Sequence, residues 1–460
     1  MRIVFLQQLW YEWQAPMIFS AIAKQKGHNT VMYIKPNPRA AAKTAINNNA
    51  DLIVFASITS GNIKYVYECA EYIKEQANIP IIAGGTFVSL YYRDISMKHI
   101  DFLGIGEGEI TFSLILDFLE NKASVKSIPG LAYVQNSKMI INTPKAISDI
   151  NKIPTIDREL YYKYALFRKE NVRMFYSGRG CLYNCSYCCM PLLDKIDPSI
   201  PVIRKRQPEN LIGEISYVKK QYGLKAAFFQ DDTFTQDKEW LMRFLPLYKK
   251  HIGKPFMCIS RASDIDEDIA NAFAYSGCIG VSMSLETANE NIRKTILNRI
   301  ETNSQITNTI KLLKERNIKV TTLNMVGIPG ETLDDIYNTI NFNRENKVDS
   351  AWAILFQPYV NAASFNIKKV REDDIGNFYS ELGYECQDRK QIELIQKLFP
   401  LLINHPKLQN IIIKVIPRLF LGLIFSIYSF YREIRLWKRS FFITLIIGLK
   451  NQIQYKKNKK

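Results

Sequence analysis

The chain has 460 residues, which exceeds one ordinary domain, because a domain typically has about 100 to 200 residues and an α/β barrel about 250. Its 47% hydrophobic and 23% charged residues exclude a disordered, collagenous or low-complexity protein. The formal net charge is +17, but residues 401–460 contribute +11 of it, with 12 Lys or Arg and one acid, so the basicity belongs mainly to a tail.

Residues 1–135 alternate short apolar runs with amphipathic stretches, which predicts an N-terminal α/β domain with a doubly wound, Rossmann-like parallel sheet. In residues 63–76, for example, apolar side chains recur at helical spacing. The predicted strands are 2–6, 30–33, 52–57, 79–83 and 102–103.

Small and flexible residues follow several of these strands, where a parallel sheet binds ligands at the carboxyl ends of its strands. They are Ser57, Thr59, Gly84, Gly85, Thr86, Gly106 and Glu107. These loops predict a ligand-binding edge; the alternative is that the glycines only make tight turns.

Residues 136–170 are rich in loop-forming residues and are predicted to be a linker. A second alternation then predicts a partial parallel (β/α)6 barrel over residues 171–370, with its site at the carboxyl ends of the strands. Pro208 in the first turn and Gly223 just past the end mark its first helix. The six predicted strands are 172–177, 226–230, 256–260, 279–285, 319–325 and 351–357.

Residues 371–460 are predicted to be mainly helical and basic. The uncharged runs at 419–431 and 440–449 are each shorter than the roughly 20 residues of a membrane span. The tail is therefore either an interfacial helical hairpin on an anionic membrane or a helical cap on the barrel. Since the only early apolar run, Ile3–Leu6, is too short for a signal peptide, a cytoplasmic location is expected, with peripheral attachment to the inner face of the membrane as an addition.

Three of the eight cysteines, Cys181, Cys185 and Cys188, fall within eight residues at the predicted end of the first barrel strand. Three thiolates on one short loop can hold an iron–sulfur cube and leave its fourth iron without a protein ligand. A structural zinc site would need a fourth ligand, and the adjacent Cys189 is poorly placed to provide it. Three unrelated core cysteines are the remaining alternative.

This C-x3-C-x2-C run, with Tyr187 before its last cysteine, resembles the radical S-adenosylmethionine (SAM) superfamily. The resemblance implies that Cys181, Cys185 and Cys188 bind a [4Fe-4S] cluster and that SAM chelates its open iron. It also implies contacts with SAM: Asp231 and Asp232 with its amino group, Arg261 with its carboxylate, Glu286 with its ribose, and Tyr187, Gly327 and Pro329 with its adenine, while Ser284 lies on the same strand as Glu286. Taken singly, such residues are equally typical of a helix cap, a surface salt bridge, or a turn before a helix.

An α/β domain before such a barrel resembles the cobalamin-binding (B12-binding) class of the superfamily, which implies that the loops from Ser57 to Glu107 hold a corrin. Many cobalamin domains contain Asp-x-His-x-x-Gly, and none of the four histidines here has Asp two residues before it. The cofactor is therefore bound without a histidine below the cobalt, or the domain has lost it.

The resemblance implies an enzyme that cleaves SAM reductively and, with cobalamin, methylates an unactivated carbon. Alternatives are a cobalamin-dependent radical cyclase or oxidase, a non-catalytic corrinoid-binding protein, and a methylthiotransferase. The expected partners are a small-molecule or lipid substrate and an electron donor such as a flavodoxin or ferredoxin, with no nucleic acid.

Overall fold

The computed structural model describes residues 1–357, 382, 384 and 386–405. The chain divides into two compact units. Unit 1 comprises Met1–Lys169 and Leu192–Pro201, and unit 2 comprises Glu170–Pro191 and the described residues from Val202 onward.

Unit 1 contains a seven-stranded sheet in the order β2-β1-β3-β4-β5-β6-β7. Its first five strands are parallel, while β6 and β7 continue the sheet antiparallel. The strands are β1 (Arg2–Gln7), β2 (Asn29–Ile34), β3 (Leu52–Phe55), β4 (Ile81–Gly84), β5 (Phe102–Gly104), β6 (Leu131–Gln135) and β7 (Lys138–Ile141). The predicted strands of this unit are all present, and β6 and β7 were not predicted.

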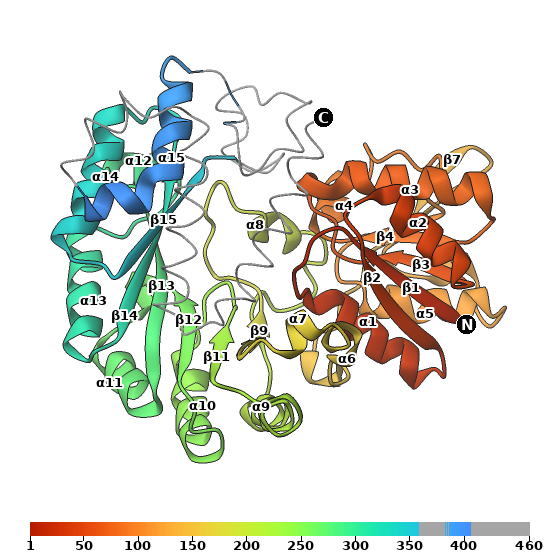
Figure 1. The fold of residues 1–460 in the computed structure, drawn as a ribbon, viewed down its shortest axis with the longest axis horizontal. Coiled ribbons are helices and arrows are strands. Elements are labelled where there is room, and N and C mark those ends of the chain that lie inside the picture. The colour runs from red at the N-terminus through yellow and green to blue at the C-terminus, as the bar shows by residue number, and fades with distance from the viewer. Residues whose placement is uncertain (358–381, 383, 385, 406–460) are drawn as a thin grey trace. The chain divides into compact units, whose positions relative to one another are not determined.

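Helix α1 packs against α5 and helix α2 against α3, and β3 is buried along its whole length, as in a sheet covered on both faces. Figure 1 shows these helices on the two sides of the strands. The helices are α1 (Gln14–Gln25), α2 (Pro38–Asn47), α3 (Ile63–Gln76), α4 (Thr86–Tyr91) and α5 (Glu109–Leu119). The predicted doubly wound, Rossmann-like α/β domain is confirmed.

Residues 136–170, predicted to be a linker, contain β7 and two short helices, α6 (Glu159–Tyr162) and α7 (Ala165–Arg168). Tyr161 is fully buried and donates its hydroxyl to Gln7 Oε1 at 2.5 Å. Arg158 Nη1 lies 2.7 Å from Glu12 Oε1, and both side chains are buried. These contacts join the second half of the segment to the body of unit 1.

Unit 2 is built on a six-stranded parallel sheet in the order β15-β14-β13-β12-β11-β8. Strands β8 and β15 form its two edges, so the sheet is open, and the predicted partial (β/α)6 barrel is confirmed. The strands are β8 (Val172–Phe175), β11 (Ala226–Phe229), β12 (Phe256–Ser260), β13 (Cys278–Glu286), β14 (Lys319–Val326) and β15 (Ser350–Leu355).

Helices follow the strands along the outside of the curved sheet (Figure 1). They are α9 (Pro208–Tyr222), α10 (Lys238–His251), α11 (Glu267–Ser276), α12 (Glu290–Thr295), α13 (Asn303–Glu315) and α14 (Leu333–Glu345). Helix α9 begins at Pro208 and is followed by Gly223 at φ 76°, as the sequence predicts. A core of aromatic rings in stacked and edge-to-face pairs around Phe229, Phe234 and Phe256 joins the sheet to these helices.

The first part of the predicted helical tail is α15 (Arg389–Asn404), which packs against β15 and α14. Ile395, Leu398 and Phe399 are buried there, so this helix covers the barrel. The apolar runs at 419–431 and 440–449 lie outside the described residues, and so does the membrane contact predicted from them. Within the part of the chain that the structure describes, no helix is long and apolar enough to cross a membrane.

Candidate active site

The three cysteines lie on one loop, which we define as residues 180–189 and call the cysteine loop. It begins after β9 (Gly178–Arg179), which pairs antiparallel with β10 (Arg204–Lys205). Gly180 has φ 90°, and a Cβ there would stand 1.6 Å from the carbonyl oxygen of Val202. Glycine is therefore required where the loop leaves its strand.

Hydrogen bonds fasten the cysteine loop to the rest of unit 2 from two directions. Gln236 Nε2 donates to the Gly180 carbonyl at 2.9 Å, while Gln236 Oε1 accepts from the Leu182 amide at 3.2 Å. The Ser186 amide donates to the Leu297 carbonyl at 3.1 Å. The sequence did not single out Gln236, because a glutamine after a strand has no distinctive spacing.

The cysteine thiols differ in their surroundings. Cys185 is buried, whereas Cys181 and Cys188 are half-buried. Burial raises the pKa of Cys181 and of Cys185, and a hydrogen bond with Cys189, followed by burial, raises the pKa of Cys188. Among the described residues, no three His, Cys, Asp or Glu side chains stand in the arrangement of a metal site, so the thiols share a loop without being gathered around one point.

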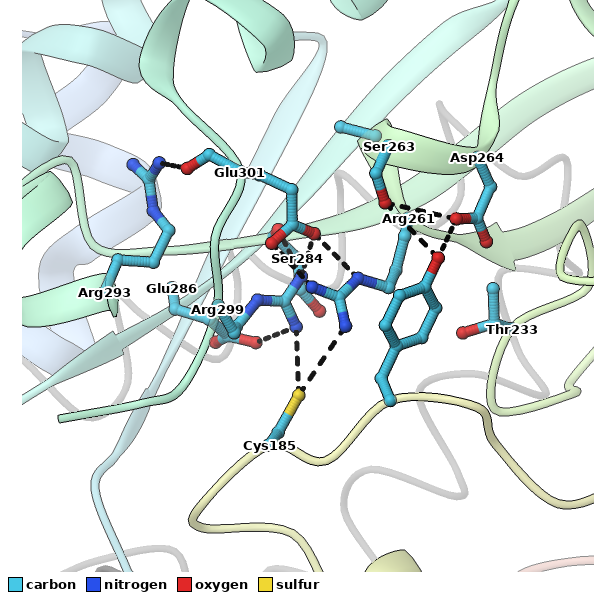
Figure 2. Close-up of polar contacts among 12 residues, drawn as sticks. Cys185, Thr233, Arg261, Ser263, Asp264, Ser284, Glu286, Arg293, Arg299 and Glu301 are labelled. Atoms are coloured by element: carbon cyan, nitrogen blue, oxygen red, sulfur yellow. Dashed lines mark hydrogen bonds and ion pairs between the residues drawn. The ribbon is translucent and has the colours of Figure 1, made fainter. Parts of the chain in front are cut away.

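Two buried guanidinium groups face the sulfur of Cys185, as Figure 2 shows. Arg261 Nη1 lies 3.8 Å and Arg299 Nη1 3.9 Å from Cys185 Sγ. Positive groups favour the thiolate form that binds iron. Three thiols on one short loop, with N–H donors at the buried one, fit a cysteine-ligated iron–sulfur cluster.

Glu301 holds both arginines in place. Its carboxylate accepts from Arg261 Nε at 2.7 Å, from Arg261 Nη2 at 2.5 Å and from Arg299 Nη2 at 3.1 Å. Burial raises the pKa of Glu301, but the hydrogen bond from Arg261 and the charge of Arg299 outweigh it and leave the pKa below its usual value. Two of the donor nitrogens of Arg261, the predicted partner of the SAM carboxylate, are therefore engaged by Glu301.

Glu286, the predicted ribose contact, ends β13 in a left-handed backbone conformation with φ 63°. The pairing register with β14 shifts between Ser284 and Glu286, so the strand carries an irregularity there. The Tyr187 hydroxyl donates to Glu286 Oε1 at 2.7 Å, and the Ser284 carbonyl accepts from Arg299 Nη2 at 3.2 Å. Such a conformation is costly for a residue other than glycine and is typical of functional sites. Tyr187, Ser284 and Glu286 are thus brought together with Cys185.

The two adjacent aspartates differ in their surroundings. Asp231 is buried and accepts from the Ser177 amide at 3.1 Å and from the Ser177 hydroxyl at 2.5 Å, and Lys205 Nζ lies 3.5 Å away. These contacts join the ends of β8 and β11. Asp232 is exposed, and its charge adds to the burial that raises the pKa of Cys181.

The turn after β14 is held by a buried carboxyl group. Glu331 Oε2 accepts from the amides of Gly327 at 2.8 Å and Ile328 at 3.2 Å, and burial raises the pKa of Glu331 to about 8. Gly327 has φ 76°, and a Cβ there would lie 2.7 Å from Leu382 Cδ1. Pro329, the other predicted adenine contact, is buried in the same turn.

In unit 1, the loops after β3 and β4 touch. Gly85 has φ 129°, and a Cβ there would lie 2.4 Å from the amide nitrogen of Ile58. The Ile58 amide donates to the Gly84 carbonyl at 2.9 Å, and Thr86 begins α4. Gly85 thus does more than make a turn, because its missing side chain lets the backbone of this loop approach the backbone of Ile58 closely.

An open pocket lies at the carboxyl ends of β1 and β3. The chain reverses its direction of winding between these strands, and ligands of doubly wound sheets bind at such a point. Ser57 lines the pocket together with Gln7, Gln8 and Asn62, which the sequence did not single out. The other predicted cobalamin residues, from Thr59 to Glu107, are outside its lining, and Gly106 donates its amide to Ser89 Oγ at 2.9 Å.

A doubly wound domain followed by an open parallel barrel with a three-cysteine loop is the framework of a corrinoid and iron–sulfur enzyme. The family profile for the radical SAM superfamily matches residues 175–342, and that for the B12 binding domain matches residues 14–116. The chain belongs to the cobalamin-binding radical SAM superfamily. Its cofactors are a [4Fe-4S] cluster, SAM and cobalamin.

The chain is 27% identical over 315 residues to an uncharacterized methyltransferase of Pyrococcus horikoshii, covering 67% of each chain. The radical SAM methyltransferase TsrM from Kitasatospora setae, solved with cobalamin and a [4Fe-4S] cluster bound, has the same fold at a TM-score of 0.65 and 14% identity, over 79% of this chain and 76% of its own. The cobalamin-dependent enzyme OxsB gives 0.62 at 13% identity, over 82% and 55%.

Other relatives are named for different reactions. The anaerobic magnesium-protoporphyrin IX monomethyl ester cyclase of Synechocystis is 25% identical over 52% of this chain and 48% of its own. The ribosomal-protein methylthiotransferase RimO of Clostridioides difficile is 25% identical over 62% and 67%. Family membership therefore identifies the cofactors, whereas the reaction could be methyl transfer, methylthio transfer or cyclisation.

Proposed function

We propose that the protein methylates an unactivated carbon of a small-molecule or lipid substrate. The observation that carries this proposal is the buried Cys185 thiol, which two arginines face beside the Tyr187–Glu286 pair at the carboxyl edge of the barrel sheet. When bound, the cluster and SAM supply a hydrogen-abstracting radical, and cobalamin supplies the methyl group. The uncharacterized methyltransferase among the relatives supports methyl transfer.

The protein's own residues bind and orient these groups. Cys181, Cys185 and Cys188 hold the cluster. Asp232 is exposed near Cys181, so its carboxylate suits the cationic amino group of SAM. Glu286, oriented by Tyr187, accepts hydrogen bonds from the ribose.

In unit 1, the loop residues Ser57, Thr59, Gly84, Gly85, Thr86, Gly106 and Glu107 hold the corrin, without a histidine below the cobalt. Gly85 supports this assignment, since its missing side chain lets two loop backbones meet beside the pocket edge at Ser57.

The test uses the reconstituted full chain under anaerobic conditions with a strong reductant, methyl-labelled SAM and cobalamin. Formation of deoxyadenosine together with transfer of label to the cobalamin, with S-adenosylhomocysteine as coproduct, is the expected result. Deoxyadenosine without S-adenosylhomocysteine contradicts methyl transfer.

Iron content tests the cysteine assignment separately. Wild type should hold about four irons per chain, the content of one cube. Cys185→Ala should lose the iron and the brown colour, whereas Cys258→Ala, a fully buried thiol on β12, is the matched control that should keep both. Retention of all iron by Cys185→Ala contradicts the assignment.

A cobalamin-dependent radical cyclase is the second candidate, favoured by the Synechocystis cyclase among the relatives. A cyclase consumes SAM to deoxyadenosine without transferring its methyl group, so the same labelling experiment separates the two functions.

If the substrate is a lipid, the protein must reach a membrane, and its basic tail is the segment suited to bind one. The tail lies outside the described residues. Co-sedimentation with vesicles of phosphatidylserine and phosphatidylcholine, compared between the full chain and a chain ending at His405, tests this. The truncation retains α15, whose buried residues belong to the barrel. Equal binding by both chains excludes a role of the tail.

A further inference from the structure

Arg261 and Arg299 come from separate segments of unit 2 and converge on one sulfur atom. Arg261 follows β12, and Arg299 follows α12. Their Nη1 atoms lie 3.8 and 3.9 Å from Cys185 Sγ, and both side chains are buried (Figure 2). We propose that Arg261 and Arg299 are positioning residues that raise the reduction potential of the cluster by donating N–H groups to the Cys185 sulfur. This inference rests on the proposed role of Cys185 as a cluster ligand.

The arginines are held in this orientation by the protein itself. Glu301 engages Nε and Nη2 of Arg261, which turns the remaining nitrogen, Nη1, toward the sulfur. Arg293 in turn donates to the Glu301 carbonyl and, through Nε, to the Thr287 carbonyl at 3.0 Å. The donors are therefore in place before a cluster binds and need little reorganisation.

The formal charges of Arg261 and Arg299 are balanced by those of Glu301 and Glu286, the carboxylates that pair with them. The sulfur nevertheless faces the N–H groups, because Glu301 engages other nitrogens of both guanidinium groups. Arg299 Nη1 is shared between the sulfur and Glu286 Oε1, which lies 3.5 Å away. Two cationic N–H donors thus face the sulfur.

Reduction of the cluster adds one negative charge at this position. Hydrogen bonds to a cluster sulfur stabilise the more negative state and raise the potential. The effect is strong at a buried sulfur, because water screens it little. Removing either arginine should therefore make the cluster harder to reduce.

Arg299 also contacts Glu286 and Tyr187, two of the residues predicted to contact SAM. Its Nη1 lies 3.5 Å from Glu286 Oε1 and 3.4 Å from the Tyr187 hydroxyl. A change at Arg299 can therefore disturb SAM binding as well. For this reason the potential is measured before SAM is added.

The test is a redox titration of the reconstituted full chain, followed by electron paramagnetic resonance, in wild type, Arg261→Gln and Arg299→Gln. Arg173→Gln is the control, because Arg173 is a buried arginine of the same unit that donates to the carbonyls of Tyr222 and Gly223. We expect a shift to more negative potential in the first two variants and no shift in the control. Unchanged potentials at full iron content overturn the proposal.

If a glutamine variant does not fold or retain iron, Arg261→Lys and Arg299→Lys decide. Lysine keeps the charge but has one nitrogen, which Glu301 engages, so the N–H at the sulfur is still lost. A negative shift in these variants supports the proposal and a wild-type potential overturns it. Failure of the cysteine assignment would be recognised separately, by iron retained in Cys185→Ala.

Discussion

Replacing Glu301 with glutamine tests whether the buried network stabilises unit 2. The carboxylate is buried between Arg261 and Arg299, and the amide of the variant would present an NH₂ group to one of the guanidinium donors. The variant removes the carboxylate that pairs with both arginines, and Glu286 then pairs only with Arg299. Breaking a buried ion pair by removing one partner typically costs about 3–5 kcal/mol.

We expect the free energy of unfolding to fall by about 3 kcal/mol, the lower end of this range, because glutamine keeps one acceptor oxygen. For a unit of about 200 residues, this lowers the Tm by roughly 6–12 °C.

The stabilisation by Glu301 depends on pH, because the carboxyl group must be ionised to pair with the arginines. Since the pKa of Glu301 in the folded protein lies below its usual 4.5, its stabilisation is present above pH 4.5 and is lost as the pH falls through the folded pKa. The difference between wild type and variant should therefore shrink below pH 4.5.

Urea denaturation followed by circular dichroism at several pH values measures both effects. Glu267→Gln is the matched control, because the Glu267 side chain is 75% exposed and lies 3.2 Å from Arg316 in a surface pair. The free energy of unfolding of Glu267→Gln should fall by less than about 1 kcal/mol. If Glu301→Gln is no more destabilised than Glu267→Gln at pH 7, the reasoning is refuted.

Three further predictions concern single positions. Gly85→Ala should lower the Tm of unit 1 and weaken cobalamin binding, because its Cβ would meet the Ile58 backbone at 2.4 Å; an unchanged melting curve contradicts this. Glu331→Gln should become more stable than wild type as the pH rises from 4.5 to 8, because the raised pKa of Glu331 costs the folded wild type stability over that range; parallel pH profiles in urea titrations would refute it. Gln236→Ala removes two hydrogen bonds to the cysteine loop and should lose iron to a chelator faster than wild type does; an unchanged half-life would disprove this.

The fold was largely readable from the sequence, because strands buried on both faces leave continuous apolar runs between amphipathic helices. Helix α3 and strand β12 have the predicted bounds. Strands β6 and β7 were missed, because their exposed and half-buried residues break the pattern. The segment containing Tyr161 resembles a linker in composition, and its packing depends on Gln7, 154 residues earlier.

Local spacing predicted the part of the site that lies on one loop. The cysteines are neighbours in sequence, and the family resemblance added Tyr187 and Glu286, which the structure places 2.7 Å apart. Arg299 and Glu301 were missed because they follow a helix, where no strand end marks them. Their contacts with Cys185 and Arg261 span 114 and 40 residues, and only the folded sheet brings such positions together.

The covering of β15 by α15 has a consequence for how the protein avoids self-association. An uncovered edge strand can pair with a strand of another molecule and start aggregation. Gln396 on α15 donates its amide to the Ala353 carbonyl at 2.9 Å, so a side chain takes the place that a neighbouring strand would otherwise occupy. A chain cut between the barrel and α15 would keep all three cysteines, but its strand β15 would be free to pair with a strand of another molecule, so we expect it to aggregate.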